Sequence, residues 1–221
     1  MQLTPVQVRV LGCLVEKERA TPDNYPLTMN ALLAACNQTT NRYPVVSFTQ
    51  PTVANAVENL KGDNLLRIDF SRSNRADKYR HVLDQVLDVD DAEISVLAVL
   101  MLRGPQTAAE VRSRADRLHP FADQSEVEGI LARLAARADP LVVRLAPLPG
   151  QKEARWAHLL AGDVSPEDVA AAASSGSAEA GRASRTERLE ALEDAVAALT
   201  DEVNRLRAAH EALESRLDGL L

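Results

Sequence analysis

Residues 8–14 read VRVLGCL and residues 94–100 read ISVLAVL, and this pair of apolar segments decides the fold. A second pair accompanies it, because KYRHVL at residues 78–83 is similar to RWAHLL at residues 155–160. The members of the two pairs are 86 and 77 residues apart. Repeats of this length indicate a duplicated domain of about 80 residues rather than a solenoid of short repeats. The sequence therefore predicts one structural unit present twice.

The helices of the first copy are marked by their capping residues. Thr4, followed by Pro5, is typical of a helix start, and Thr28 and Thr49 are placed to cap a second and a third helix. The pair Lys61-Gly62 is expected to end the third helix. The first helix carries apolar residues on two faces, so we expect it to lie in the middle of a small domain.

The second copy repeats this order. Asp90 or Asp91 is expected to begin its first helix, and Gly104-Pro105 to end it. Capping boxes are predicted at Thr107–Glu110 and Ser125–Glu128, with Asp139-Pro140 ending the third helix. Each copy then ends in two predicted strands. The strands are residues 65–70, 78–83, 141–145 and 154–160.

Three helices followed by a β-hairpin are typical of the winged-helix arrangement, a variant of the helix-turn-helix. The predicted fold class is thus mainly α with small β-hairpin wings (α+β), as tandem winged-helix domains followed by a C-terminal coiled-coil helix. The expected segments are two winged-helix domains at 1–88 and 89–163, a flexible linker at 164–186 and a zipper at 187–221.

Composition and charge exclude several protein classes. The chain has 221 residues, 46% of them hydrophobic, and a net charge of −7. It has no apolar run of the roughly 20 residues that span a bilayer, and its N-terminus does not resemble a signal peptide, so a cytoplasmic protein without membrane contact is expected. Its two cysteines, Cys13 and Cys36, suit neither a disulfide framework nor a zinc knuckle. Both fall on inward helix faces and are interpreted as small buried apolar residues.

The last part of the chain is acidic and carries a heptad repeat. Residues 164–221 hold 6 basic and 12 acidic side chains, and residues 187–221 show an unbroken 3,4 spacing of apolar positions. Leucine at every d position with valine at two a positions favours a parallel pair of helices, although antiparallel pairing and pairing with another protein stay open. The predicted dimerisation residues are Leu189, Leu192, Val196, Leu199, Val203, Leu206, His210, Leu213, Leu217 and Leu220.

Three motifs carry a family resemblance. YPLTMNAL at residues 25–32, ACNQTTNR at 35–42 and RGPQTAAEVRSRA at 103–115 resemble the YceH family of bacterial proteins, and the likeness extends over nearly all of residues 1–163. The resemblance implies a tandem winged-helix fold. It implies no established activity, no cofactor and no catalytic residue, because members of the family are essentially uncharacterised.

Winged helices usually bind duplex DNA with the third helix in the major groove and the wing against the backbone. Amide side chains can read adenine, and cations can contact phosphates. The candidate DNA-contact residues are Arg42, Gln50, Thr52, Asn55, Asn59, Lys61, Arg72, Arg75 and Lys78. The loop that contains Arg42 has an alternative interpretation, in which its polar side chains satisfy its own backbone. Glu58 lies on the same helix and would repel phosphate.

The second copy is predicted to be a poorer DNA reader, because its wing holds only Lys152 and Arg155 against Glu153. His81 and His158 occupy equivalent positions, which favours buried hydrogen-bonded residues over a metal pair. No motif of an enzyme, cofactor site or metal site is found. We therefore expect a non-enzymatic, transcription-regulator-like DNA-binding protein that forms a homodimer through its zipper. The alternative is a scaffold that binds an unidentified protein partner without DNA.

Overall fold

The computed structural model describes residues 2–69, 76–147 and 153–164, and all of them belong to one compact unit. The predicted linker, apart from Val164, and the predicted zipper lie outside the described residues. Arg72 and Arg75 lie outside them as well. The described chain is mixed α and β, with helices and two small antiparallel sheets, as the predicted α+β class requires.

The first copy contains helices and three short strands in the order expected for a helix bundle with a hairpin. Its elements are α1 (Pro5–Ala20), the 3-10 helix η1 (Pro22–Asn24), β1 (Leu27–Thr28), α2 (Met29–Cys36), α3 (Gln50–Gly62), β2 (Leu66–Asp69) and β3 (Lys78–His81). The antiparallel sheet has the order β1-β3-β2, with Leu27 opposite Tyr79 and Leu66 opposite His81. The strand β1 was not predicted from the sequence, because two residues carry no alternation of apolar and polar positions.

The second copy repeats this order after a short connecting helix. Its elements are α4 (Leu83–Leu87), which makes the connection, then α5 (Asp91–Arg103), α6 (Ala108–Ala115), α7 (Gln124–Ala135), β4 (Val142–Leu145) and β5 (Arg155–His158). A single antiparallel bridge between Gln106 and Trp156 occupies the place that β1 has in the first copy. The helix α4 was also missed, since Val82, the residue before its first turn, provides no side-chain cap.

Most helix starts agree with the capping predictions. The hydroxyls of Thr4, Thr28 and Thr49 each accept a hydrogen bond from the backbone N–H three residues later. Asp90 and Thr107 form full capping boxes with the glutamates three residues on. These caps satisfy N–H groups that a helix cannot bond internally.

One capping prediction was wrong. Asp123, not Ser125, caps α7, because the Asp123 carboxylate accepts from the backbone N–H of Glu126. Ser125 therefore lies inside the first turn. The same helix ends at Ala135, before the expected stop at Asp139-Pro140.

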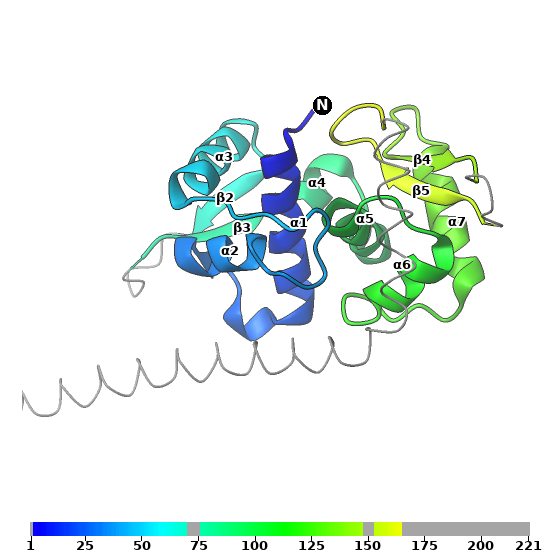
Figure 1. The fold of residues 1–221 in the computed structure, drawn as a ribbon, viewed down its shortest axis with the longest axis horizontal. Helices are drawn as coiled ribbons and strands as arrows, with labels where there is room; N and C mark the ends of the chain where they lie inside the picture. Colours follow the sequence, from blue (N-terminus) through cyan, green and yellow to red (C-terminus); the bar gives the residue numbers. More distant parts are fainter. Residues whose placement is uncertain (1, 70–75, 148–152, 165–221) are drawn as a thin grey trace, which may run out of the picture. The chain divides into compact units, whose positions relative to one another are not determined.

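The helices α1 and α5 lie side by side at the centre of the described unit (Figure 1). Figure 1 shows α2 and α3 on one side of this pair and α6 and α7 on the other. Nine consecutive residues are buried in each helix, Gln7–Val15 in α1 and Ile94–Leu102 in α5. The burial of α1 agrees with the two apolar faces predicted for the first helix. One face packs within its own copy, and the other packs against α5 of the second copy.

Gly12 allows the close approach of these two helices. A Cβ atom at Gly12 would lie 2.9 Å from Leu102 Cγ and Cδ2 and 3.3 Å from Met101 Cβ. Real Cβ atoms almost never come within 3.0 Å of another heavy atom, so the Leu102 side chain of α5 occupies the space that a side chain at residue 12 would need. At the junction of the two copies, side chains of α5 therefore pack directly against the backbone of α1.

Candidate nucleic-acid interface

The helix α3 has one buried apolar face and one exposed polar face. Val53, Ala56, Val57 and Leu60 are buried in the core. The opposite face carries the predicted DNA-contact residues of this helix, all of them exposed. These are Gln50, Thr52, Asn55, Asn59 and Lys61.

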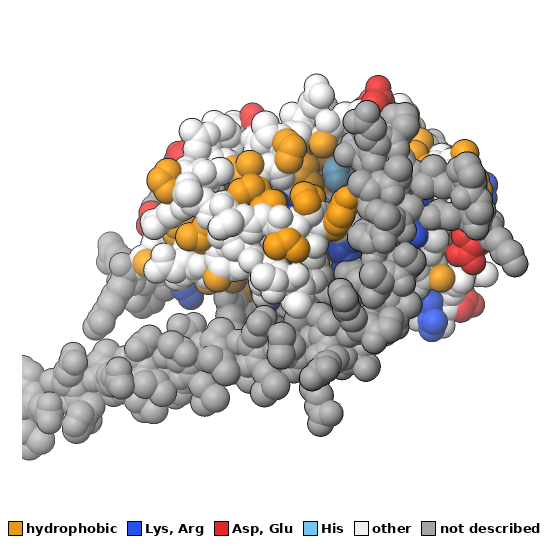
Figure 2. Space-filling model, in the orientation of Figure 1, with side chains coloured by type: hydrophobic (Ala, Val, Ile, Leu, Met, Phe, Trp, Pro, Cys, Tyr) orange, Lys and Arg blue, Asp and Glu red, His pale blue; other side chains and the backbone are white. Residues whose placement is uncertain are grey.

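The exposed face of α3 is rich in hydrogen-bonding side chains that retain free donors and acceptors. Asn59 Nδ2 donates to Asn55 Oδ1 at 3.0 Å. Both amide N–H donors of Asn55 and the amide oxygen of Asn59 therefore remain for another molecule, and a donor beside an acceptor is the pattern that adenine matches in the major groove. In the view of Figure 2 the surface over α3 is mainly white and orange, with little blue.

Lys61 at the end of α3 is less available than the sequence indicates. Its ammonium group lies 3.3 Å from the Glu58 carboxylate, and both side chains are largely exposed. An exposed pair of this kind contributes at most about 1 kcal/mol, so a phosphate could displace the carboxylate. Glu58 nevertheless lowers the local positive charge, as expected.

The hairpin next to α3 carries cations on its outer face. Lys78 and Arg80 on β3 alternate with the buried Tyr79 and His81, and Arg67 on β2 lies directly opposite Arg80. No ion pair among the described residues engages Arg67, Lys78 or Arg80. Arg67 was missed in the sequence, although its alternation with Leu66 and Ile68 indicates an outward position. The hairpin therefore presents three cations beside α3.

The structure corrects one candidate. Arg42 is buried, with its side chain fully inaccessible, and its guanidinium forms a double hydrogen bond with Glu16 at 2.5 and 2.9 Å. Its Nε also donates to the carbonyl of Ala35 at 3.1 Å. A buried and fully paired guanidinium cannot contact DNA without breaking this network. Arg42 is therefore a structural residue rather than a candidate for DNA contact.

The polar side chains of the loop between α2 and α3 bond to the loop itself, as the alternative interpretation of this loop predicts. Asn37 Nδ2 donates to the carbonyl of Phe48 at 2.9 Å, and Asn37 Oδ1 accepts from the backbone N–H of Phe48 at 2.7 Å. Gln38 accepts from Arg42 at 2.6 Å. These side chains close the loop on itself, so they position the start of α3.

The two third helices can be compared position by position. The buried residues Val53, Ala56, Val57 and Leu60 of α3 correspond to Val127, Ile130, Leu131 and Leu134 of α7, at a constant offset of 74. With this offset, Thr52 corresponds to Glu126, Asn55 to Gly129 and Asn59 to Arg133. The amide pair of α3 has no counterpart in α7, and a carboxylate replaces a hydroxyl. The second copy presents a different surface at the equivalent place.

Arginines of the second copy are engaged within the fold. Arg133 lies 3.4 Å from Glu93, and Arg155 lies 2.8 Å from Glu110. Arg137 donates to the carbonyls of Leu87 and Asp88 at 2.6 and 3.1 Å. These three cations contact the second copy and its connection to the first.

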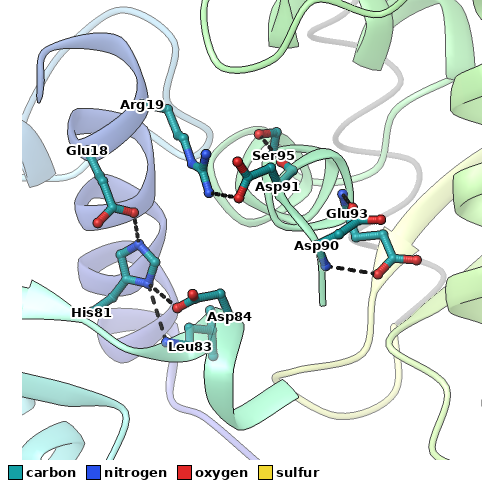
Figure 3. Close-up of polar contacts among 9 residues, drawn as sticks. All are labelled: Glu18, Arg19, His81, Leu83, Asp84, Asp90, Asp91, Glu93 and Ser95. Carbon is teal, nitrogen blue, oxygen red and sulfur yellow. Dashed lines mark hydrogen bonds and ion pairs between the residues drawn. The ribbon is translucent and has the colours of Figure 1, made fainter. Parts of the chain in front are cut away.

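The two histidines differ in their surroundings. His81 is buried between two carboxylates (Figure 3): its Nε2 donates to Glu18 at 2.7 Å, and its Nδ1 accepts from the backbone N–H of Leu83 at 3.3 Å and lies 3.5 Å from Asp84. His158 is half-buried, its buried Nδ1 has no partner among the described residues, and burial lowers its pKa to about 4.

The network of Figure 3 joins the two copies, because Arg19 at the end of α1 forms an ion pair with Asp91 at the start of α5. Within residues 2–69, 76–147 and 153–164, no three His, Cys, Asp or Glu side chains are grouped as a metal site needs. No helix in the same ranges is long and apolar enough to cross a membrane.

Comparison with known proteins identifies the family. The model of a family described as "Protein of unknown function, DUF480" matches residues 3–151. A UPF0502 protein of Burkholderia cenocepacia strain HI2424 is 45% identical over 216 residues, 98% of this chain and 89% of the relative. A UPF0502 protein of Geobacter sulfurreducens is 52% identical over 168 residues, 75% of this chain and 76% of the relative. The chain therefore belongs to the DUF480 or UPF0502 family, which is the YceH family that its motifs indicate.

Proposed function

We propose that this chain is a non-enzymatic protein that binds duplex DNA through the exposed face of α3 and the hairpin formed by β2 and β3. The observation that carries the proposal is an exposed amide and hydroxyl face on α3 beside a hairpin whose three cations, Arg67, Lys78 and Arg80, have no ion-pair partner among the described residues. Phosphate contacts by the cations would position the helix, and the amides would contact base edges.

The proposal treats each copy as a winged-helix domain. The order helix, strand, helix, helix and hairpin supports this interpretation, as does the pairing of β1 with β3 in the first copy. In such domains the third helix enters the major groove. The predicted zipper at residues 187–221 would join two chains, and two modest sites on one dimer bind more tightly than one through their effective concentration.

The alternative is a scaffold for another protein. It is favoured by the engagement of Arg133, Arg137 and Arg155 within the second copy and by the net charge of −7. The described residues offer no continuous apolar face on which such a partner could dock. Their exposed large apolar side chains are Val45 and Val86, which lie on separate segments. The second copy would then be the partner-binding module.

The experiment is a titration of a labelled duplex of random sequence with the full-length protein, followed by fluorescence anisotropy at several salt concentrations. The test variant is Arg67→Gln, Lys78→Gln and Arg80→Gln, which removes three cations from the hairpin. The matched control is Arg112→Gln, Arg117→Gln and Arg144→Gln, which removes three exposed cations from the second copy. The total charge of the two variants is equal.

We expect the hairpin variant to reduce the slope of log affinity against log salt by roughly 2–3, because each phosphate contact contributes about 0.9. The control variant should keep most of the slope. Equal losses in both variants would show that net charge alone drives binding. The absence of binding at low salt would reject the DNA proposal and favour the scaffold.

A further inference from the structure

His81 at the end of β3 is a buried titratable side chain that the proposed DNA interface does not use. Its side chain is 1% exposed, and both of its ring nitrogens have partners (Figure 3). The Nε2 atom lies 2.7 Å from Glu18 Oε2 on α1, and Nδ1 lies 3.3 Å from the backbone nitrogen of Leu83 at the start of α4. The ring therefore joins three elements, and one of them, α4, leads to the second copy.

The contact with Leu83 defines the charge of the ring. A backbone N–H group can only donate a hydrogen bond, so Nδ1 must be the nitrogen without a proton. The proton of the ring is then on Nε2, which donates it to the Glu18 carboxylate. A ring with these partners is a neutral imidazole.

The neutral ring takes the place of a side-chain cap on α4. The N–H groups in the first turn of a helix have no partner within the helix, and Val82 before this turn offers no side-chain acceptor. His81 Nδ1 accepts from one of these groups, that of Leu83. The other end of α4 is held from the second copy, because Arg137 donates to two carbonyls there. The connection between the copies is thus fixed at its start by an unprotonated nitrogen.

A carboxylate lies beside the same nitrogen as an alternative partner. Asp84 Oδ1 is 3.5 Å from His81 Nδ1, and the Asp84 side chain is 36% exposed, which leaves it room to move towards the ring. A proton on Nδ1 would make this nitrogen a donor, and a donor repels the Leu83 N–H group but attracts the carboxylate. The protonated ring would therefore be held by Glu18 and Asp84, and Leu83 would lose its acceptor.

The other titratable and charged groups around the ring come from the neighbouring elements. Tyr25, which precedes β1, accepts from the backbone N–H of His81 at 2.9 Å, and burial raises the pKa of its phenol, which stays neutral. Burial also acts to raise the pKa of Glu18, but the contact with His81 and the charge of Arg19 outweigh it, so this pKa lies below its ordinary value. Arg19 itself is paired with Asp91 on α5.

We propose that His81 is a proton-operated switch at the connection of the two copies. In the neutral state, Nδ1 accepts from the Leu83 N–H and fixes the first turn of α4. In the protonated state, Nδ1–H donates to the Asp84 carboxylate, and the Leu83 N–H is released. Each state has its own set of partners, which is what a two-state element requires. The switch acts on the connection of the copies whether or not the chain binds DNA.

The experiment follows the full-length chain, labelled with nitrogen-15, by NMR from about pH 8 to about pH 5, the range in which histidine side chains ordinarily change charge. The imidazole signals report the tautomer and the protonation of His81, and the amide signal of Leu83 reports its hydrogen bond. At about pH 8 we expect a proton on Nε2 alone. As the pH falls, Nδ1 should gain a proton, and the Leu83 amide signal should change with the same midpoint.

Two carboxylate variants test the role of Asp84. Asp84→Asn removes the charge that the protonated ring needs, so the midpoint should require about tenfold more acid than in the natural protein. The matched control is Asp88→Asn, which removes the same charge at the other end of α4. Asp88 is exposed and has a left-handed backbone conformation that asparagine also adopts, so this midpoint should change by less than about twofold.

The natural protein alone can overturn the proposal. A His81 ring that keeps one protonation state over the whole pH range, or a Leu83 amide signal that does not follow the ring, would show that no switch exists. Equal midpoints in Asp84→Asn and Asp88→Asn would show that Asp84 is not the alternative partner. In His81→Gln the Leu83 signal should lose its pH dependence, and an unchanged midpoint there would assign the response to another group and reject the proposal.

Discussion

At the scale of the residue, Arg42 shows that one side chain can fit two different interpretations of the same sequence. Arg42 follows the polar residues at 37–41 and precedes α3, so the sequence leaves a contact with DNA and a structural role both open. Its partner Glu16 lies 26 positions earlier, on another helix, and nothing in the local sequence links the two. The Asn55–Asn59 pair differs in this respect, because its members are four positions apart on one helix and such residues share a face.

The ion pair between Arg42 and Glu16 gives a stability prediction. Glu16→Gln keeps the size of the side chain but leaves the buried guanidinium with an uncharged partner, so we expect the free energy of unfolding to fall by about 2–3 kcal/mol. The control is Glu58→Gln, whose exposed pair with Lys61 should change stability by less than about 1 kcal/mol. Urea denaturation of both variants makes the comparison. Equal effects would mean that Arg42 is not held as the structure indicates.

His158 gives a prediction on pH. Its folded pKa of about 4 lies below the ordinary value of 6.5, so the unfolded chain binds a proton between these values while the folded chain does not. Stability therefore falls as the pH drops through this range, by up to about 3 kcal/mol from this residue. His158→Phe should lose that part of the pH dependence. Denaturant unfolding at about pH 7.5 and about pH 4.5 tests this, and identical pH profiles for the two proteins would contradict it.

At the scale of the element, the sequence predicts helices better than strands. Thr4, Thr28, Thr49, Asp90 and Thr107 cap helices where expected, because a cap depends on a few neighbouring residues. At the start of α7 the cap is Asp123 and not the predicted Ser125. Both side chains can cap a helix, and only the backbone conformation distinguishes them. The strand β1 exists through pairing with β3, and pairing partners lie far away in the sequence.

The start of α3 is the cap that matters most for the interface. Thr49→Ala removes the acceptor for the backbone N–H of Thr52, and the expected loss of stability is about 1 kcal/mol. Thr49→Ser keeps the acceptor and should behave like the natural protein. Thermal and urea unfolding of the two variants would show whether the hydroxyl, rather than the methyl group, is responsible.

The packing of α1 against α5 gives a prediction at the same scale. Gly12→Ala would place a methyl group 2.9 Å from the buried Leu102 side chain, so that side chain or the helices must shift, and we expect the free energy of unfolding to fall by about 1–3 kcal/mol. The matched control is Gly129→Ala on α7, where a Cβ meets nothing within 4 Å. That change should be neutral or stabilise the protein by up to about 1 kcal/mol. The opposite order of the two stabilities would show that α1 and α5 are not in close contact.

At the scale of the whole molecule, the sequence predicts two similar units. It does not predict how their surfaces differ or how the two units pack against each other. Repeated segments indicate two similar units, and their difference lies in single positions such as Asn55 and Gly129. The junction formed by α1, α5 and the pair Arg19–Asp91 depends on contacts between the copies. Such contacts have no signature in one sequence, since apolar residues at either face of α1 look alike.

The central claim is that the first copy, and not the second, contacts DNA. Amide hydrogen exchange of the full-length protein, measured by mass spectrometry with and without duplex DNA, tests it most directly. We predict slower exchange on DNA binding in peptides that cover α3 and the strands β2 and β3, and unchanged exchange in peptides that cover α7. Protection of α7 alone, or no change in α3 at a DNA concentration that saturates the anisotropy signal, would contradict the account.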